Sequence, residues 1–150
     1  MIRNISVEIV LLFVPIACIF CLTNVEALTD VMLQGFQECK EENNVTEGDL
    51  DTMKRREIPE SRDAKCFLAC LMERFGMMEG ARLSVEGAKG MLAEIPDLPE
   101  DAKEKISQAV DDCESILQYG EGEGDPCENA VGISMCISDK AIEKGVSAPE

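Results

Sequence analysis

The chain of 150 residues contains no histidine and no tryptophan. Without histidine, Ser-His-Asp and Cys-His nucleophile pairs and His-ligated catalytic zinc sites are excluded. Basic residues are also scarce, since fourteen Lys and Arg stand against thirty Asp and Glu, for a formal net charge of −16. This charge repels phosphate backbones and anionic membrane surfaces, so nucleic acid is not an expected partner. We expect no enzymatic activity and no cofactor.

Long apolar runs are equally rare, and the one that stands out lies near the N-terminus. Residues 1–27 combine Arg3, an apolar run from Ile9 to Leu22, and Ala27 in a small-residue cleavage pattern. This run is shorter than the roughly 20 residues that a membrane-spanning helix needs. We therefore predict a secretory signal peptide over 1–27 and a secreted, extracellular domain over 28–150, with no stable membrane insertion.

The rest of the chain has the apolar spacing of helices. Apolar residues recur every three or four positions, and Pro, Gly, Asn and Asp lie where helices start and stop. Thr46 with Asp49 resembles a capping box, Ser61 suits an N-cap, and Gly87 and Gly90 should weaken one helix by roughly 1 kcal/mol each. The pattern predicts an all-α fold with six helices, covering approximately 28–42, 46–58, 62–75, 84–96, 99–117 and 125–142.

Three other features of the sequence bear on metal binding, chain flexibility and modification. The acidic residues nowhere match a calcium loop with its twelfth-position glutamate, so we expect no metal site. Residues 119–124 alternate glycine with other residues and are expected to form a flexible connector. Asn44 opens an N-glycosylation sequon in an expected exposed turn, and we predict glycosylation there.

Cysteine is abundant, and its even count after signal removal indicates disulfides. Of eight cysteines, two fall in the expected signal peptide. Six cysteines in an oxidising compartment predict three disulfides. The retained cysteines are Cys39, Cys66, Cys70, Cys113, Cys127 and Cys136, which follow the pattern C-x26-C-x3-C-x42-C-x13-C-x8-C.

Helix geometry limits the pairing without fixing it. Cys66 and Cys70 lie four residues apart on one expected helix, so each is better placed to bond a different neighbouring helix. Cys127 and Cys136 lie nine apart, on opposite flanks of their helix. Six cysteines allow about fifteen connectivities, and these two pairs are disfavoured while the others stay open.

The cysteine pattern resembles that of the insect odorant-binding proteins. Three residues separate the second and third cysteines and eight separate the fifth and sixth, and the segment KCFLACLMERFGMMEG around Cys66 and Cys70 is also similar to the family. The resemblance covers the whole domain after the signal peptide. It implies a six-helix fold, bridged Cys39–Cys70, Cys66–Cys127 and Cys113–Cys136.

The resemblance also implies an apolar pocket between the helices, in which a small hydrophobic molecule is carried through aqueous fluid. Methionine-rich walls would make such a pocket adaptable. Tyr119 is the one tyrosine and a candidate polar anchor. The residues that we expect to line the pocket are Met32, Phe36, Leu71, Phe75, Met91, Ile106, Val110, Ile133 and Ile137, although plain core packing is an equal alternative for each.

The expected partners are a small hydrophobic ligand and, as a candidate, a membrane chemoreceptor that receives this ligand. We expect the chain to be a monomer or a weak homodimer. Family members often release their ligand in acid, and without histidine such release must depend on the protonation of carboxylates, at about pH 5 or below.

The main alternative is a secreted helical effector that acts through its surface and has no internal cavity. A disulfide-rich phospholipase would need a histidine and a calcium loop, and a saposin-like module has other cysteine spacings.

Overall fold

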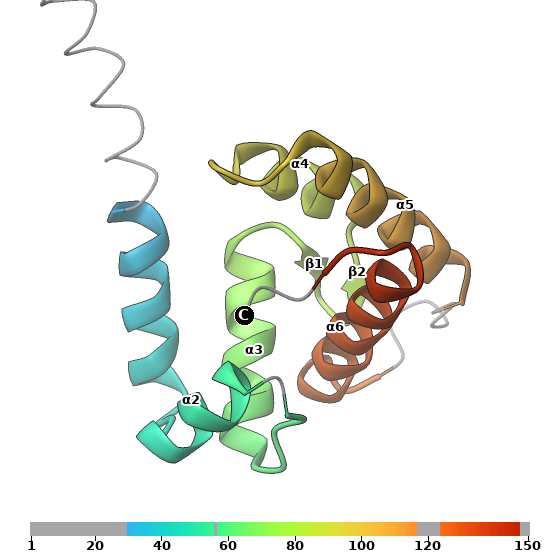
Figure 1. Ribbon diagram of the computed structural model, residues 1–150. Coiled ribbons are helices and arrows are strands. Elements are labelled where there is room, and N and C mark those ends of the chain that lie inside the picture. The colour runs from blue at the N-terminus through green and yellow to red at the C-terminus, as the bar shows by residue number, and fades with distance from the viewer. Residues whose placement is uncertain (1–29, 56, 117–123, 148–150) are drawn as a thin grey trace, which may run out of the picture. The chain divides into compact units, whose positions relative to one another are not determined.

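The computed structural model describes residues 30–55, 57–116 and 124–147. The chain divides into two compact units, Met1–Glu38 and Cys39–Glu150, which are considered separately. The described part of the first unit is helical and belongs to a helix over 30–42 (blue in Figure 1). The expected signal peptide, residues 1–27, lies outside the described residues.

The second unit is built from helices with one short hairpin (Figure 1). The described helices follow the sequence expectation to within a few residues at each end. The elements are α2 (Glu47–Lys54), α3 (Arg62–Arg74), β1 (Met78–Glu79), β2 (Arg82–Leu83), α4 (Val85–Glu94), α5 (Glu100–Ile116) and α6 (Pro126–Glu143).

Short polar side chains start these helices. Thr46 and Asp49 form a capping box at α2, in which the Thr46 hydroxyl accepts the Asp49 N–H and the Asp49 carboxylate accepts the Thr46 N–H. Ser61 accepts the Ala64 N–H at α3, and Asp125 accepts the Cys127 N–H at α6. Each cap satisfies a backbone donor that the helix leaves free and contributes about 1 kcal/mol. The expected caps are therefore confirmed.

The hairpin between α3 and α4 was not expected from the sequence. Met78 pairs with Leu83 and Glu79 with Arg82, antiparallel, with Gly80 at φ 61° in the turn. Strands of two residues are too short to leave an alternating pattern in the sequence. The hairpin is held by tertiary contact, because β1 packs on α3 and β2 on α6.

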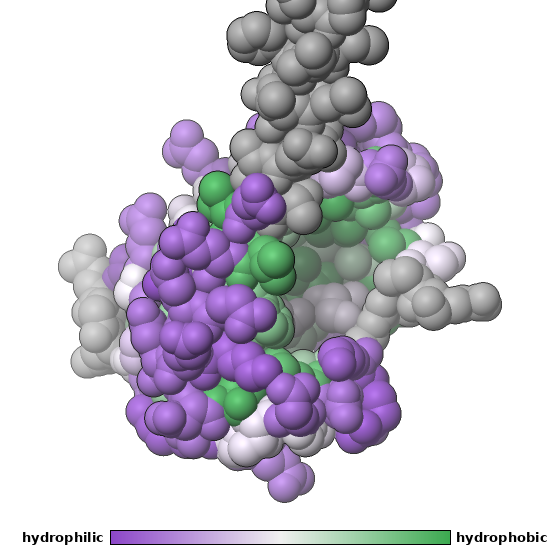
Figure 2. Space-filling model, turned by 90° about the vertical axis from the view of Figure 1, so that its left-hand side faces the viewer, coloured by the Kyte–Doolittle hydropathy of each residue, from purple (hydrophilic) through white to green (hydrophobic). Residues whose placement is uncertain are grey.

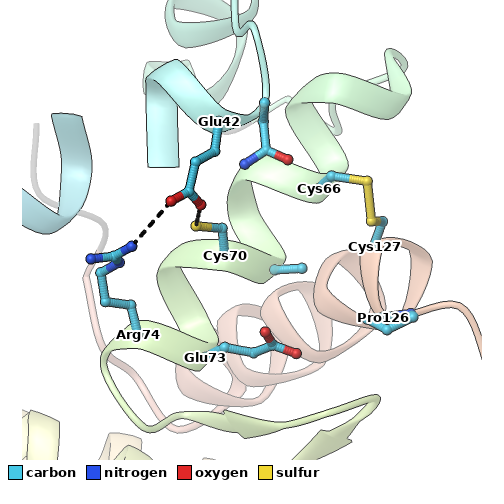
Figure 3. Close-up of a pocket in the computed structure, with 9 residues that line it drawn as sticks. Glu42, Cys66, Cys70, Glu73, Arg74, Pro126 and Cys127 are labelled. Carbon is cyan, nitrogen blue, oxygen red and sulfur yellow. Dashed lines mark hydrogen bonds and ion pairs between the residues drawn. A yellow bond between two sulfur atoms is a disulfide. The ribbon is translucent and has the colours of Figure 1, made fainter. Parts of the chain in front are cut away.

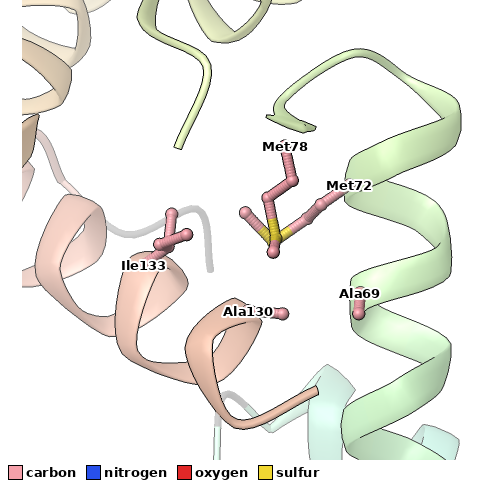
Figure 4. Packing of buried hydrophobic residues seen from close by; sticks show 5 residues of the cluster. All are labelled: Ala69, Met72, Met78, Ala130 and Ile133. Carbon is pink, nitrogen blue, oxygen red and sulfur yellow. The ribbon is translucent and has the colours of Figure 1, made fainter. Parts of the chain in front are cut away.

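The core of the second unit lies where α3, the hairpin and α6 meet. Its buried cluster consists of Ala69, Met72, Met78, Ala130 and Ile133 (Figure 4). Met72 and Met78 bring their flexible thioethers together there, and Ala69 and Ala130 let the two helices approach closely. Burial of these side chains fixes the hairpin and α6 against α3.

Four helices of the second unit form a closed circuit. α3 packs against α6, α6 against α5, and α5 against α4. The circuit closes where α4 begins, because Gly87 lies against the backbone of Gly76, just after α3. The Ser84 N–H also donates to the Met77 carbonyl at 2.9 Å. Gly87, expected only to weaken its helix, thus makes a close contact that a larger residue would prevent.

Three disulfides brace the second unit: Cys39–Cys70, Cys66–Cys127 and Cys113–Cys136. This is the pairing that the family resemblance implies, and it contains neither of the two pairs that helix geometry disfavours. Two of the bridges start from α3, one turn apart, and lead to different segments. α3 is therefore cross-linked both to residue 39 and to the start of α6.

Hydrophilic residues cover much of the face shown in Figure 2, and hydrophobic residues are exposed among them. This is expected of a chain with 29 % charged residues, because ionised side chains keep their hydration at the surface. Large apolar side chains exposed in the second unit include Ile58, Met135 and Ile142.

Candidate ligand-binding site

The nine residues expected to line an apolar pocket are distributed over both units. Met32 and Phe36 lie in the first unit, on helix 30–42, and both are half-buried. The other seven lie on the four circuit helices or directly at their ends. These are Leu71 and Phe75 at the C-terminal end of α3, Met91 on α4, Ile106 and Val110 on α5, and Ile133 and Ile137 on α6.

Two of the seven belong to the packed core. Ile133 is fully buried in the cluster with Met72 and Met78 (Figure 4), and Ile137 packs against that cluster. Val110 is also buried, at 2 % exposure. Ile133 and Ile137 thus contact the core cluster, and their place in a pocket wall stays a prediction.

The remaining four circuit residues keep accessible apolar surface. Leu71, Phe75, Met91 and Ile106 are all half-buried. They come from three helices of the same circuit, and each has apolar area that a bound molecule could cover. These four residues therefore stay candidates for the predicted lining.

A surface groove of about 680 Å³ lies in the second unit (Figure 3). It lies beside α3 and the start of α6, and it contains none of the nine predicted residues. Its lining consists of Glu42, Asn43, Cys66, Ala69, Cys70, Glu73, Arg74, Pro126 and Cys127. A second groove, of about 520 Å³, lies between α4 and α5, has mainly charged walls, and also contains none of the nine. Several charged side chains line each groove, whereas sites for lipophiles are lined mainly by hydrophobic and aromatic side chains.

The first groove is lined by three bridged cysteines, Cys66, Cys70 and Cys127, and by one ion pair. Arg74 contacts Glu42, with 3.5 Å between the guanidinium nitrogen and the carboxylate oxygen (Figure 3). Potential ligand atoms of Cys39, Glu42 and Cys70 lie within 4.8 Å of one another. The two sulfurs are bonded to each other, however, so no thiolate is available to hold a metal there.

The first turns of α3 and α6 are joined by charge as well as by the Cys66–Cys127 bridge. Arg62 pairs with Asp125, and Lys65 contacts Glu128 at 3.0 Å. The hydrogen bond from Arg62 lowers the pKa of Asp125 below its usual value, and the hydrogen bond from the Cys127 N–H contributes a smaller effect in the same direction. All four side chains remain partly exposed, so these pairs orient the helix ends more than they stabilise them.

Asn44 occupies an exposed turn between helix 30–42 and α2, with φ 52°. The sequon threonine, Thr46, is the N-cap of α2. Tyr119, the candidate polar anchor, lies outside the described residues. The exposure of Asn44 is what a glycan acceptor requires.

One buried polar residue was missed by the sequence analysis. Asn129 on α6 is 9 % exposed, and its Nδ2 donates to the Ala81 carbonyl at 2.9 Å, tying the hairpin turn to α6. A Cβ on Gly124 would lie 2.4 Å from that same Nδ2. The sequence carried no signal for this role, because a single helical asparagine is usually solvated.

No helix among the described residues is both long and apolar enough to cross a membrane.

The sequence model of the PBP/GOBP family matches residues 23–140 of this chain, and this range includes all six bridged cysteines. The general odorant-binding protein 19d of Drosophila melanogaster is 28 % identical over 114 residues, covering 75 % of this chain and 73 % of the relative.

Solved structures with the same fold come from several insects. The odorant-binding protein OBP28a of Drosophila melanogaster has a TM-score of 0.64 at 22 % identity, covering 82 % of this chain and 99 % of that one. A pheromone-binding protein of the cockroach Leucophaea maderae, in complex with the fluorescent reporter ANS, has a TM-score of 0.59 at 24 % identity, covering 73 % of this chain and 92 % of that one. The fatty acid binding protein OBP56a of the blowfly Phormia regina has a TM-score of 0.56 at 21 % identity, covering 79 % of this chain and 95 % of that one. The expected helical, disulfide-bridged fold is confirmed.

Proposed function

The chain belongs to the PBP/GOBP family, and from this premise we propose that it is an extracellular carrier of a small hydrophobic molecule. The family match over residues 23–140 is the observation that carries the proposal. Three disulfides in the second unit support it, because such bridges persist in oxidising, extracellular compartments. Residues 1–27 are proposed as the signal peptide that directs the chain there.

The relatives support the kind of ligand. One is named a general odorant-binding protein, one is a pheromone-binding protein with a fluorescent reporter, and one is named a fatty acid binding protein. All of these ligands are small molecules with a large apolar part. A ligand of about fifteen heavy atoms at roughly 0.5 kcal/mol each would bind with a micromolar dissociation constant.

The ligand is proposed to contact the half-buried apolar residues of the circuit. Leu71, Phe75, Met91 and Ile106 offer accessible apolar area, and Val110, which is buried, lies one turn from Ile106 on α5. Met32 and Phe36, which lie in the first unit, stay predictions from the sequence pattern. No bond is made or broken in this role, and the chain delivers its ligand, as a monomer or weak homodimer, to a membrane chemoreceptor.

A dye titration tests the proposal. The secreted, disulfide-intact protein is titrated with the neutral fluorophore N-phenyl-1-naphthylamine, and medium-chain alcohols and esters are added as competitors. We expect saturable fluorescence enhancement in the micromolar range that the competitors reverse. An effector that acts only through its surface would leave the fluorescence unchanged, and that result would refute the carrier role.

A further inference from the structure

Most of the basic side chains that the structure describes are already engaged by carboxylates of the same chain. Of fourteen Lys and Arg, Arg3 and Arg56 lie outside the described residues, and Arg82 is exposed. Each of the other eleven forms an ion pair with an Asp or Glu of the chain. At each of these eleven cations, an anionic ligand would therefore have to displace a carboxylate of the protein.

The least exposed cations illustrate this. The side chains of Lys65 and Lys103 are each 20 % exposed, and they are held by Glu128 at 3.0 Å and by Glu100 at 3.3 Å. Lys103 also donates to the Ala93 carbonyl at the end of α4. Neither ammonium group is free to turn toward a ligand between the helices without breaking these contacts.

The buried interior formed by the described residues contains no cation. Within the described residues Asn129 is the one buried polar side chain, and its amide already donates to the Ala81 carbonyl. No buried side-chain nitrogen or oxygen there lacks a hydrogen-bond partner. A polar group of a ligand would enter an interior in which each such atom is already used.

From these observations we propose that the carrier selects neutral lipophiles, such as esters, alcohols and hydrocarbons, and discriminates against ionised carboxylates and sulfonates. This inference rests on the proposed carrier function and specifies its ligand class. Transfer of an ionised carboxylate out of water is costly unless it gains a paired charge and hydrogen bonds. A neutral ester loses far less hydration, so the same apolar chain binds more tightly as the ester.

Two dyes with one ring skeleton test the selectivity. N-phenyl-1-naphthylamine is neutral, and ANS is the same anilinonaphthalene with a sulfonate. We expect the neutral dye to bind at least about tenfold more tightly than ANS at neutral pH. The preference should persist at about 0.5 M salt, where long-range repulsion from the net charge is screened. A preference that disappears in salt would overturn the inference, because it would come from overall charge alone.

A matched ester and acid provide the second arm. Methyl laurate and lauric acid share one alkyl chain and are compared as competitors of the neutral dye. At neutral pH the ester should compete at least about tenfold better than the acid. As the pH falls through the pKa of the acid, about 4 to 5, the two should converge because the acid becomes neutral. The ester reports at each pH whether the binding site is intact.

The outcomes separate this inference from the carrier function. If lauric acid competes as well as methyl laurate at neutral pH, the selectivity is wrong while the carrier function stands. If neither the neutral dye nor the ester binds, the carrier function fails and the selectivity fails with it.

Discussion

Gly87 lies directly against Gly76: a Cβ at position 87 would lie 1.7 Å from the Gly76 carbonyl oxygen. The contact joins the first turn of α4 to the end of α3 and closes the helix circuit. No side chain fits at that distance, and the obstacle is backbone, which cannot rotate away. Only glycine at position 87 therefore lets α4 approach the Gly76 backbone this closely, although glycine also lowers the helix propensity of α4.

We expect Gly87→Ala to lower the free energy of unfolding by at least about 2 kcal/mol, because α4 must move away from Gly76. Gly90 on the same helix is the matched control, since nothing lies within 4 Å of a Cβ there. Gly90→Ala should stabilise the protein by about 0.5–1 kcal/mol. Urea unfolding of the disulfide-intact variants measures both, and equal effects would contradict the assignment.

Asn129 is expected to be more important for stability than its position on a helix suggests. Asn129→Ala removes the donor to the Ala81 carbonyl and should destabilise by about 1–3 kcal/mol, because a hydrogen bond from a buried side chain is lost. Asn43 makes an amide-to-carbonyl bond of the same 2.9 Å length to Cys39 at a half-buried site. Asn43→Ala should cost less, since water can replace that bond. Thermal unfolding of the two variants tests the difference, and a larger loss at position 43 would be inconsistent with it.

Stability should fall in acid partly through Asp125. Arg62 and the Cys127 N–H lower the pKa of Asp125 in the folded state. The stabilisation is therefore present above the unfolded-state pKa of about 3.9 and is lost as the pH falls through the folded-state pKa. Asp125→Asn keeps a capping side chain but should reduce the loss of stability below about pH 4. Asp97→Asn, at an exposed site with φ 62°, is the control and should keep the wild-type profile. Denaturant midpoints across the acid range measure this, and an unchanged profile in Asp125→Asn would contradict it.

Binding of the neutral dye should depend on Met91 and not on Met135. Met91 is half-buried on α4, whereas Met135 is 41 % exposed on α6. Met91→Trp should fill space proposed for the ligand and weaken binding by about tenfold or more. Met135→Trp makes the same chemical change at the surface and should leave binding unchanged. Circular dichroism checks that both variants fold, and equal affinities would remove Met91 from the proposed wall.

Asn44 is expected to carry an N-linked glycan on the secreted protein. Asn44→Gly removes the acceptor and accepts the φ of 52°, so it should abolish the mass that peptide N-glycosidase releases without perturbing the turn. Thr46→Ser keeps both the sequon and the N-cap of α2 and should retain the glycan. Intact-mass analysis of protein secreted by insect cells decides, and an unmodified wild-type chain would refute the prediction.

The helices could be predicted because their starts are local chemistry. The hydroxyls of Thr46 and Ser61 cap backbone groups only three residues away, so the sequence alone carries the signal. The hairpin and Gly87 could not be predicted, because both depend on segments that meet only in the fold. The nine lining residues illustrate the same limit: periodicity places Ile133 and Met91 on apolar faces, but it cannot distinguish a packed core from an accessible wall.

The three bridges overlap along the chain in a continuous series. The intervals 39–70, 66–127 and 113–136 leave no gap between residue 39 and residue 136. One peptide-bond cleavage anywhere between these limits therefore falls inside at least one covalent ring and separates nothing. A protease that nicks a surface loop would yield a two-chain molecule that migrates as a single species until a reductant is added, which would prolong the working life of a protein in a fluid that contains such enzymes.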